Sequence, residues 1–218
     1  MWAKERAALV AVARGDAVAD CVVRGGLLLN VYTGECYPAS VAIKGERIAY
    51  VGARDDMVGP RTEVIDATGR TLVPGYIEPH AHPWNLGTPA VLARHVLPLG
   101  TTTIFADNLL VYSLAGVTGF ERTVAALARG PVKFYWMVRP HGQSRTLDEG
   151  ARFPVRAIAR MLDNPWVAAV GEVTRWTDLV AGRPELLERL ALGHARGKRI
   201  EGHTAGANAE RVAGLAAA

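Results

Sequence analysis

The spacing of hydrophobic and polar residues divides the chain into three stretches. In the first, residues 1–19, the spacing from Ala3 to Arg14 predicts a short amphipathic N-terminal helix. In the second, residues 20–71, short β-rich runs alternate with turn signals such as Gly25-Gly26, which predicts a small antiparallel β-sandwich domain. The expected strands of that domain are 21–23, 27–29, 40–43, 47–51 and 62–65.

The third stretch, residues 72–218, repeats a rhythm of strand, loop and helix about five times. Its expected strands are 72–77, 102–106, 132–138, 167–172 and 199–201, and its expected helices are 89–97, 119–128, 154–162, 184–196 and 207–216. Consecutive β/α units predict a parallel α/β sheet, which is either doubly wound or part of a (β/α)8 barrel. Both arrangements gather the chemistry at the carboxyl ends of the strands.

Composition narrows the class of protein. The chain has 218 residues, 50% hydrophobic and 21% charged, which is typical of a soluble globular protein with a real core. Its formal charge of +4 is scattered, and its tryptophans are widely separated, so no nucleic-acid partner is expected. The chain has no long uncharged run, so we expect neither a membrane span nor a secretion signal. Cys21 and Cys36 form no CxxC pair, and a reducing cytoplasm fits best.

Residues of the types that bind metals recur at the predicted strand ends. The five segments are Glu78-Pro79-His80-Ala81-His82, Asp107-Asn108, Arg139-Pro140-His141, Gly171-Glu172 and Glu201-Gly202-His203. In an extended segment residues i and i+2 point to the same side, so His80 and His82 can offer two imidazoles to one ion. An isolated HxH pair is more often chance than a site, and the surrounding sequence decides between the two.

That surrounding sequence is Leu72-Val73-Pro74-Gly75-Tyr76-Ile77-Glu78-Pro79-His80-Ala81-His82, which follows Ile65-Asp66-Ala67-Thr68-Gly69. It resembles the amidohydrolase superfamily, whose members carry Pro-Gly, two apolar residues and Asp-x-His-x-His at the end of the first barrel strand. Glu78 stands here in place of the usual Asp. Within the superfamily the whole chain looks most like the adenine deaminase family, in a divergent branch. The resemblance implies a partial TIM-like barrel over residues 72–218 and a small composite β-domain before it.

The resemblance also implies a metal site. Val170-Gly171-Glu172-Val173 resembles the fourth-strand segment whose Glu bridges two metals, and the segment from Ile200 to Gly206 resembles the fifth-strand segment that supplies a third histidine, here His203. We therefore expect His80, His82, Glu172 and His203 to bind two divalent ions of manganese, iron or zinc. The implied reaction is the attack of a metal-bridging hydroxide on adenine, giving hypoxanthine and ammonia, with Glu172 as the catalytic carboxylate.

One position departs from the family. The resemblance implies an Asp-Pro-His-Glu segment after the second strand, whose Glu shuttles protons to the purine, but this chain has Asp107-Asn108-Leu109-Leu110. Leu110 cannot move protons, so another residue does so or the small-molecule substrate is not adenine. Arg139 and His141 are candidates for substrate contact, and Asp107 is a candidate second-shell residue that orients a ligand.

Three hypotheses follow. The leading one is an N-terminal fragment of an adenine deaminase or close relative, inactive alone because a sixth-strand His and an eighth-strand Asp are still to come. The second is an amidohydrolase for a cyclic amide or N-acyl substrate, which suits the replacement of the shuttle Glu by Leu110 and the presence of Arg139. The third is an inactive scaffold. A homo-oligomer is left open by the sequence.

Overall fold

The computed structural model describes residues 2–85, 87–143 and 151–218. The chain forms two compact units, Met1–Pro74 and Gly75–Ala218, and each is described by itself. No helix in the described ranges is both long and apolar enough to cross a membrane.

The smaller unit is one sheet with a helix. Its elements are α1 (Trp2–Arg14), β1 (Cys21–Leu29), β2 (Cys36–Lys44), β3 (Arg47–Gly52), β4 (Glu63–Asp66) and β5 (Thr71–Leu72). Strands β3, β2 and β1 form an antiparallel meander, and β4 and β5 both pair with β1 in parallel. Helix α1 packs on β2 and β3, where Val12, Val22 and Ala42 are fully buried.

The Gly25-Gly26 pair in this unit is not the predicted turn. It lies inside the continuous strand β1, where the register with β2 shifts between Val23 and Gly26. Gly25 has a φ of 83°, a left-handed conformation that glycine adopts without strain and that accommodates an irregularity within a strand. A bulge and a turn demand the same residue, so the sequence pattern does not distinguish them.

The larger unit is a five-stranded parallel sheet in the order β10-β9-β8-β7-β6 with helices between the strands. Its elements are β6 (Tyr76–Ala81), η1 (Pro83–Asn85), α2 (Pro89–Val96), η2 (Leu97–Leu99), β7 (Thr101–Asp107), α3 (Leu109–Leu127), β8 (Lys133–Val138), α4 (Val155–Leu162), β9 (Val167–Val173), α5 (Trp176–Val180), α6 (Pro184–His194), β10 (Arg199–Gly202) and α7 (Ala209–Ala217). This confirms the predicted run of five β/α units.

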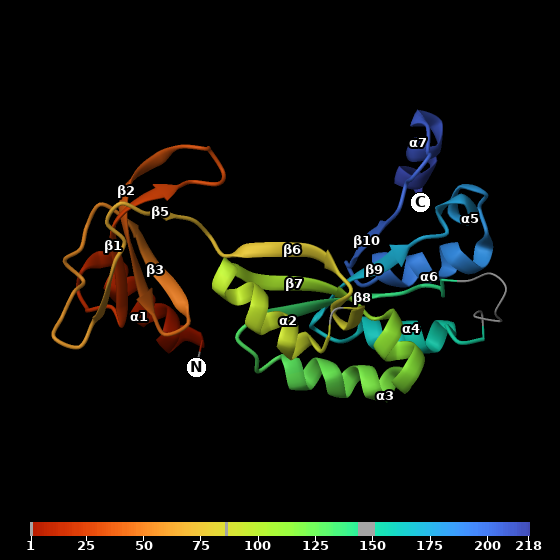
Figure 1. The fold of residues 1–218 in the computed structure, drawn as a ribbon, viewed down its shortest axis with the longest axis horizontal. Helices are drawn as coiled ribbons and strands as arrows, with labels where there is room; N and C mark the ends of the chain where they lie inside the picture. The colour runs from red at the N-terminus through yellow and green to blue at the C-terminus, as the bar shows by residue number, and fades with distance from the viewer. Residues whose placement is uncertain (1, 86, 144–150) are drawn as a thin grey trace. The chain divides into compact units, whose positions relative to one another are not determined.

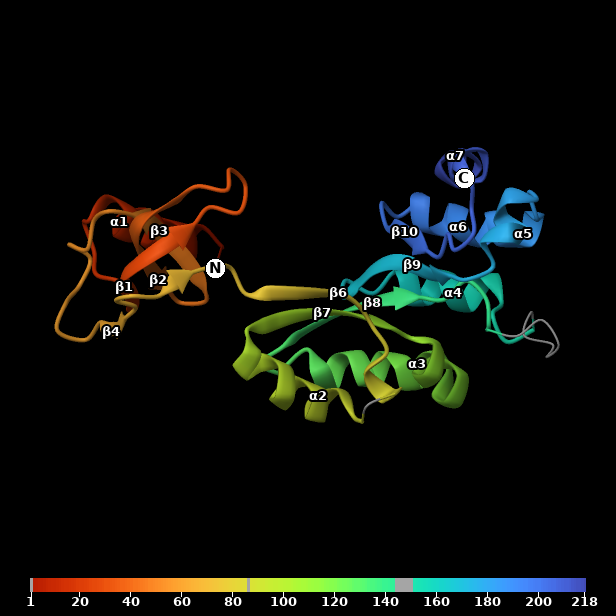
Figure 2. The ribbon, with the colours of Figure 1, turned by 45° about the horizontal axis from the view of Figure 1, so that its top comes forward.

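Helices α2 and α3 lie along one face of this sheet in both Figure 1 and Figure 2. The core lies between sheet and helices and is centred on Trp136 of β8, which is fully buried and packs edge-on against Phe120 of α3. Trp84 and Phe134 also pack on its ring. Because all five strands are parallel, their carboxyl ends meet at one end of the sheet.

In the larger unit, β6 and α3 begin four or more residues away from their predicted starts. Strand β6 spans Tyr76–Ala81, later than the expected 72–77, so that His80 lies within the strand. Helix α3 starts at Leu109, well before the expected Gly119, and contains a break at Gly116 with φ 63° and ψ −167°. The break changes the phase of the apolar pattern, so the segment before Gly116 does not share one helical periodicity with the segment after it.

Candidate metal centre

The histidines at the end of β6 converge with a glutamate from β9. The ligand atoms of His80, His82 and Glu172 all lie within 4.8 Å of one another. The Nε2 atoms of the two imidazoles are 3.3 Å apart, and they lie 3.7 Å and 3.6 Å from Glu172 Oε2. The alternation of side chains along an extended segment places both rings on the same side, as the sequence predicts. Two imidazole nitrogens and a carboxylate oxygen form a donor set that suits zinc, iron or manganese.

Each histidine has a carboxylate behind it. His80 Nδ1 lies 3.3 Å from Glu201 Oε2, at the end of β10, and His82 Nδ1 lies 3.7 Å from Asp107 Oδ1, at the end of β7. A carboxylate at Nδ1 favours the tautomer whose proton is on Nδ1, which leaves the Nε2 lone pair free to bind a cation. Asp107 therefore lies beside His82, where the sequence expects it to orient a ligand, and its Oδ1 also accepts from the Leu109 backbone N–H at 2.7 Å.

Glu172 presents its two oxygens to different partners. Its side chain is only 7% exposed, Oε2 faces His80 and His82, and Oε1 contacts Nε2 of His203. His203 lies just beyond β10 and its side chain is 53% exposed. The four ligands expected from the sequence are thus brought together, with the carboxylate between the histidine pair and the third histidine. This arrangement fits a carboxylate shared by two cations.

Arg139 is buried inside the centre, at 2% exposure. Its Nε donates to Asp107 Oδ2 at 2.5 Å, and one terminal nitrogen donates to the Glu172 backbone oxygen at 3.0 Å. The other terminal nitrogen lies 2.8 Å from Glu172 Oε2 and donates to Gln143 Oε1 at 3.0 Å. Its backbone N–H donates to Asn108 Oδ1. The guanidinium therefore joins the ends of β7, β8 and β9 through protein oxygens. The substrate contact expected for Arg139 from the sequence stays a prediction.

His141 contacts backbone atoms of Gly142 and Arg175. It is buried, with Nδ1 2.7 Å from the Gly142 backbone oxygen and Nε2 3.5 Å from the Arg175 backbone nitrogen. Burial lowers the pKa of His141, and the nearby guanidiniums of Arg139 and Arg175 lower it further. The ring is therefore a neutral part of the wall between β8 and α5.

A cavity of about 460 Å³ opens beside the candidate metal ligands His82 and Glu172. His82, Glu172 and Arg139 form part of its wall, and Trp84 and Leu110 form another part. Leu110 lies in the first turn of α3 and is 42% exposed. The position where the resemblance expects the proton-shuttle Glu thus borders the cavity, but it carries an apolar side chain.

Glu201 is the residue of the site to which the sequence assigns no role. One of its oxygens contacts His80 and the other, Oε1, is buried without a hydrogen-bond partner among the described residues. Burial raises the pKa of Glu201, and the neighbouring His80 acts in the opposite direction. Its position two residues before His203, on the same side of an extended strand, was the available signal.

Comparison with known proteins gives relatives over nearly the whole chain. No family model matches it. It is 38% identical over 214 residues to an adenine deaminase of Moorella thermoacetica, covering 96% of this chain and 36% of that protein. The chain spans about one third of the length of the curated relatives it matches.

Solved structures show the same fold. An L-hydantoinase from Arthrobacter aurescens superposes with a TM-score of 0.61 at 19% identity, covering 84% of this chain and 40% of that one. A solved adenine deaminase superposes with a TM-score of 0.52 at 14% identity, covering 86% of this chain and 52% of that one. The predicted partial barrel with a separate small β-domain is confirmed.

Proposed function

Because this chain is related to the adenine deaminases, within the amidohydrolase superfamily, we propose that it supplies the first ligands of a metal-dependent centre that hydrolyses a C–N bond. The proposed reaction of the whole protein is the deamination of adenine, or of a related aminoheterocycle, to the oxo compound and ammonia. The observation that carries the proposal is the convergence of His80, His82 and Glu172 within 4.8 Å at the carboxyl ends of parallel strands. The share of the relatives that the chain spans supports a longer parent protein.

Two divalent cations are the proposed cofactors. His80, His82 and Glu172 would bind one cation. Glu172 and His203 would supply two of the ligands of the other cation. When bound, such cations lower the pKa of water toward neutrality and polarise the bond under attack. The structure fits this donor set because separate oxygens of Glu172 face the two sides.

The other residues of the centre would prepare the ligands. Glu201 and Asp107 hold the Nδ1 edges of the two histidines, so that both Nε2 atoms face Glu172. Arg139 fixes the carboxylates of Asp107 and Glu172 relative to each other. Trp84 and Leu110 would exclude water from the wall of the 460 Å³ cavity in which we place the substrate.

Metal binding by the chain tests the first step. Zinc and manganese are titrated calorimetrically into the wild-type chain, a His80→Ala variant and a His95→Ala variant, the last being an exposed histidine on α2 and hence the matched control. We expect His80→Ala to weaken binding by at least about tenfold and His95→Ala to leave it unchanged. Equal affinities in all three proteins would contradict the proposed site.

The substrate is tested with the whole protein that carries this sequence. Release of ammonia from adenine supports the deaminase reaction. A second candidate is the hydrolysis of a cyclic amide by the same centre, which the apolar Leu110 at the cavity wall favours because ring opening needs no acid at that position. Ring opening of a cyclic amide without ammonia release from adenine would decide for this second reaction.

A further inference from the structure

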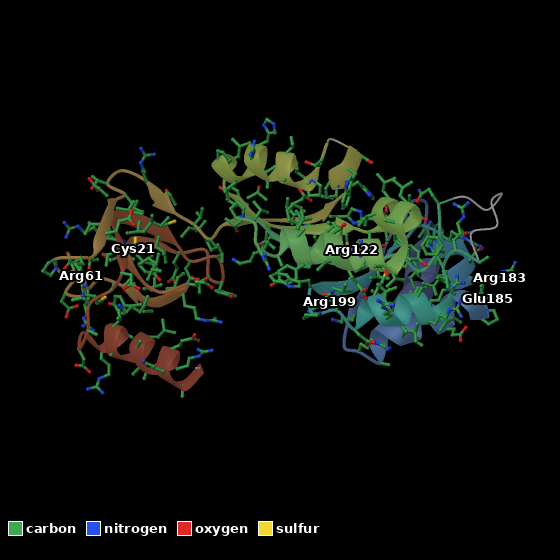
Figure 3. The ribbon with its side chains drawn as sticks, turned by 90° about the horizontal axis from the view of Figure 1, so that it is seen from below. Cys21, Arg61, Arg122, Arg183, Glu185 and Arg199 are labelled. Atoms are coloured by element: carbon green, nitrogen blue, oxygen red, sulfur yellow. The ribbon has the colours of Figure 1, made fainter. Side chains whose placement is uncertain are left out.

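A second cavity in the larger unit is rich in arginine. It has a volume of about 360 Å³, and Arg175, Arg183 and Arg189 contribute to its wall together with His141 and Leu186. It lies beside α5 and the start of α6, and Figure 3 marks Arg183 and Glu185 at that end of the unit. None of the four metal ligands named above lines it.

The charges around this cavity are unevenly paired. Arg175 is neutralised by Asp178, with Nε donating to Oδ2 at 2.6 Å. Arg183 and Arg189 form no ion pair with any other residue in the described ranges, and Arg189 Nε is buried there without a hydrogen-bond partner. Burial is also the main cause that lowers the pKa of the Arg189 guanidinium. Arg189 is partly buried, and Glu188 and Glu185 act on its pKa in the opposite direction. Its buried Nε is unfavourable without a hydrogen-bond partner, because the lost hydration is not replaced.

Glu185 is the acid that would be expected to pair with Arg189. The two residues are four apart on α6, the spacing at which opposite charges on a helix usually meet. The described structure contains no such pair, and Arg189 instead lines the cavity. The wall of the cavity therefore contains three guanidiniums and two carboxylates, those of Asp178 and Glu185. Asp178 already forms an ion pair with Arg175.

The start of α6 adds a second source of positive potential. Helix α6 has eleven residues, Pro184 occupies its first turn, and its N-cap Arg183 makes no side-chain cap hydrogen bond. Pro184 has no N–H group, and the N–H groups of Leu186 and Leu187 donate to the Arg183 backbone oxygen. The contribution of the helix start is therefore mainly the partial positive charge of the helix dipole. Guanidiniums that line one cavity at the positive end of a helix are usual elements of an anion site.

We propose that this cavity binds a phosphate-type oxyanion, with the guanidiniums of Arg183 and Arg189 as its main donors. Several donors from different directions suit a tetrahedral anion with many acceptor oxygens better than a planar carboxylate. His141 is a neutral wall residue, because its ring nitrogens face the Gly142 oxygen and the Arg175 backbone N–H. The site is separate from the metal centre and does not depend on the proposed reaction.

The experiment measures binding of inorganic phosphate to the 218-residue chain by calorimetry in chelator-treated buffer, so that no metal ion binds the anion. Sodium acetate is titrated in parallel as a carboxylate probe. The variants are Arg189→Met, Arg183→Met and Arg189→Lys, and the control is Arg122→Met, an exposed arginine on α3 that Figure 3 places on a different helix. A His80→Ala variant separates this site from the metal centre.

We expect saturable phosphate binding by the wild-type chain, weakened about tenfold or more in Arg189→Met and in Arg183→Met. Arg189→Lys should recover part of the loss, and Arg122→Met and His80→Ala should bind as the wild type does. The proposal is overturned if phosphate does not saturate, if the Arg122 variant loses as much as the others, or if acetate binds more tightly than phosphate. Because Arg183 is exposed, its variant keeps the test valid even if Arg189→Met fails to fold.

Discussion

Replacing Arg139 by methionine should strongly destabilise the larger unit. The guanidinium is 2% exposed and holds Asp107 and Glu172 at 2.5 Å and 2.8 Å. Methionine fills a similar volume but leaves both carboxylates buried without their cation. Breaking a buried ion pair by removing one partner costs about 3–5 kcal/mol. At roughly 2–4 °C per kcal/mol for a unit of this size, the Tm should fall by about 6–20 °C.

A matched control isolates the effect of burial. Arg160 also makes a two-point contact, with Glu121 at 2.8 Å and 2.6 Å, but its side chain is 60% exposed. An exposed pair contributes about 0–1 kcal/mol, so Arg160→Met should lower the Tm by no more than about 4 °C. Arg139→Lys is informative as well, because it keeps the charge and loses the planar fork that reaches both carboxylates.

Thermal unfolding followed by tryptophan fluorescence is a suitable assay. The larger unit holds Trp84, Trp136, Trp166 and Trp176, so the signal reports mainly on that unit. The reasoning is refuted if Arg139→Met and Arg160→Met lower the Tm equally. It is also refuted if Arg139→Met unfolds at the wild-type temperature, since the guanidinium would then contribute no more than a surface charge.

Three further predictions concern single positions. Glu201→Gln should weaken zinc binding by about 10–100-fold, measured by calorimetry, because His80 loses the charge behind its Nδ1. Leu110→Glu in the whole protein should raise adenine turnover by roughly 100-fold or more, because it restores an acid at the cavity wall. For His141 the lowered pKa means that the unfolded chain binds more protons than the folded chain just below about pH 6.5. The stability of the wild type should therefore fall as the pH drops through that region, and His141→Gln should reduce the fall in urea unfolding experiments.

Each of these has a result that would contradict it. Unchanged zinc affinity in Glu201→Gln would mean that the carboxylate does not orient His80. If Leu110→Glu gains nothing over a Leu110→Gln control, the missing acid is not what limits adenine turnover. A pH dependence of stability that is identical with and without His141 would show that this ring titrates equally in the folded and unfolded chain.

The sequence predicts the larger unit well because strands such as β8 and β9 are largely apolar runs and helices such as α4 have an amphipathic pattern. The histidine pair is equally local: His80 and His82 share a side of one strand by geometry alone. The start of α3 is harder to predict from the local sequence, since Gly116 adopts a conformation that no periodicity indicates. The predicted turn at Gly25-Gly26 is wrong for a related reason, because the irregularity there depends on the pairing of β1 with β2.

The roles of Arg139 and Glu201 could not be predicted from the sequence for a different reason. Arg139 is 32 residues from Asp107 and 33 from the Glu172 oxygen to which it donates, and Glu201 is 121 residues from His80. Residue type and strand-end position place them near the site. Whether a guanidinium there faces a substrate or two carboxylates depends on how neighbouring strands are staggered. That stagger becomes known only when the sheet is assembled.

The break in α3 gives the two parts of that helix different freedom to change in evolution. Before Gly116 the helix carries Leu110 and Leu114, which are 42% and 80% exposed, and the buried Tyr112; after it come Phe120 and Val124, which are buried in the core. Because the left-handed glycine interrupts the helix, substitutions at the exposed Leu110 and Leu114, unlike substitutions at Tyr112, need not disturb the packing of the rear part. Variation could therefore remodel the cavity wall while the core is conserved, which makes the turn around Leu110 a natural place for related proteins to diverge in the molecule they accept.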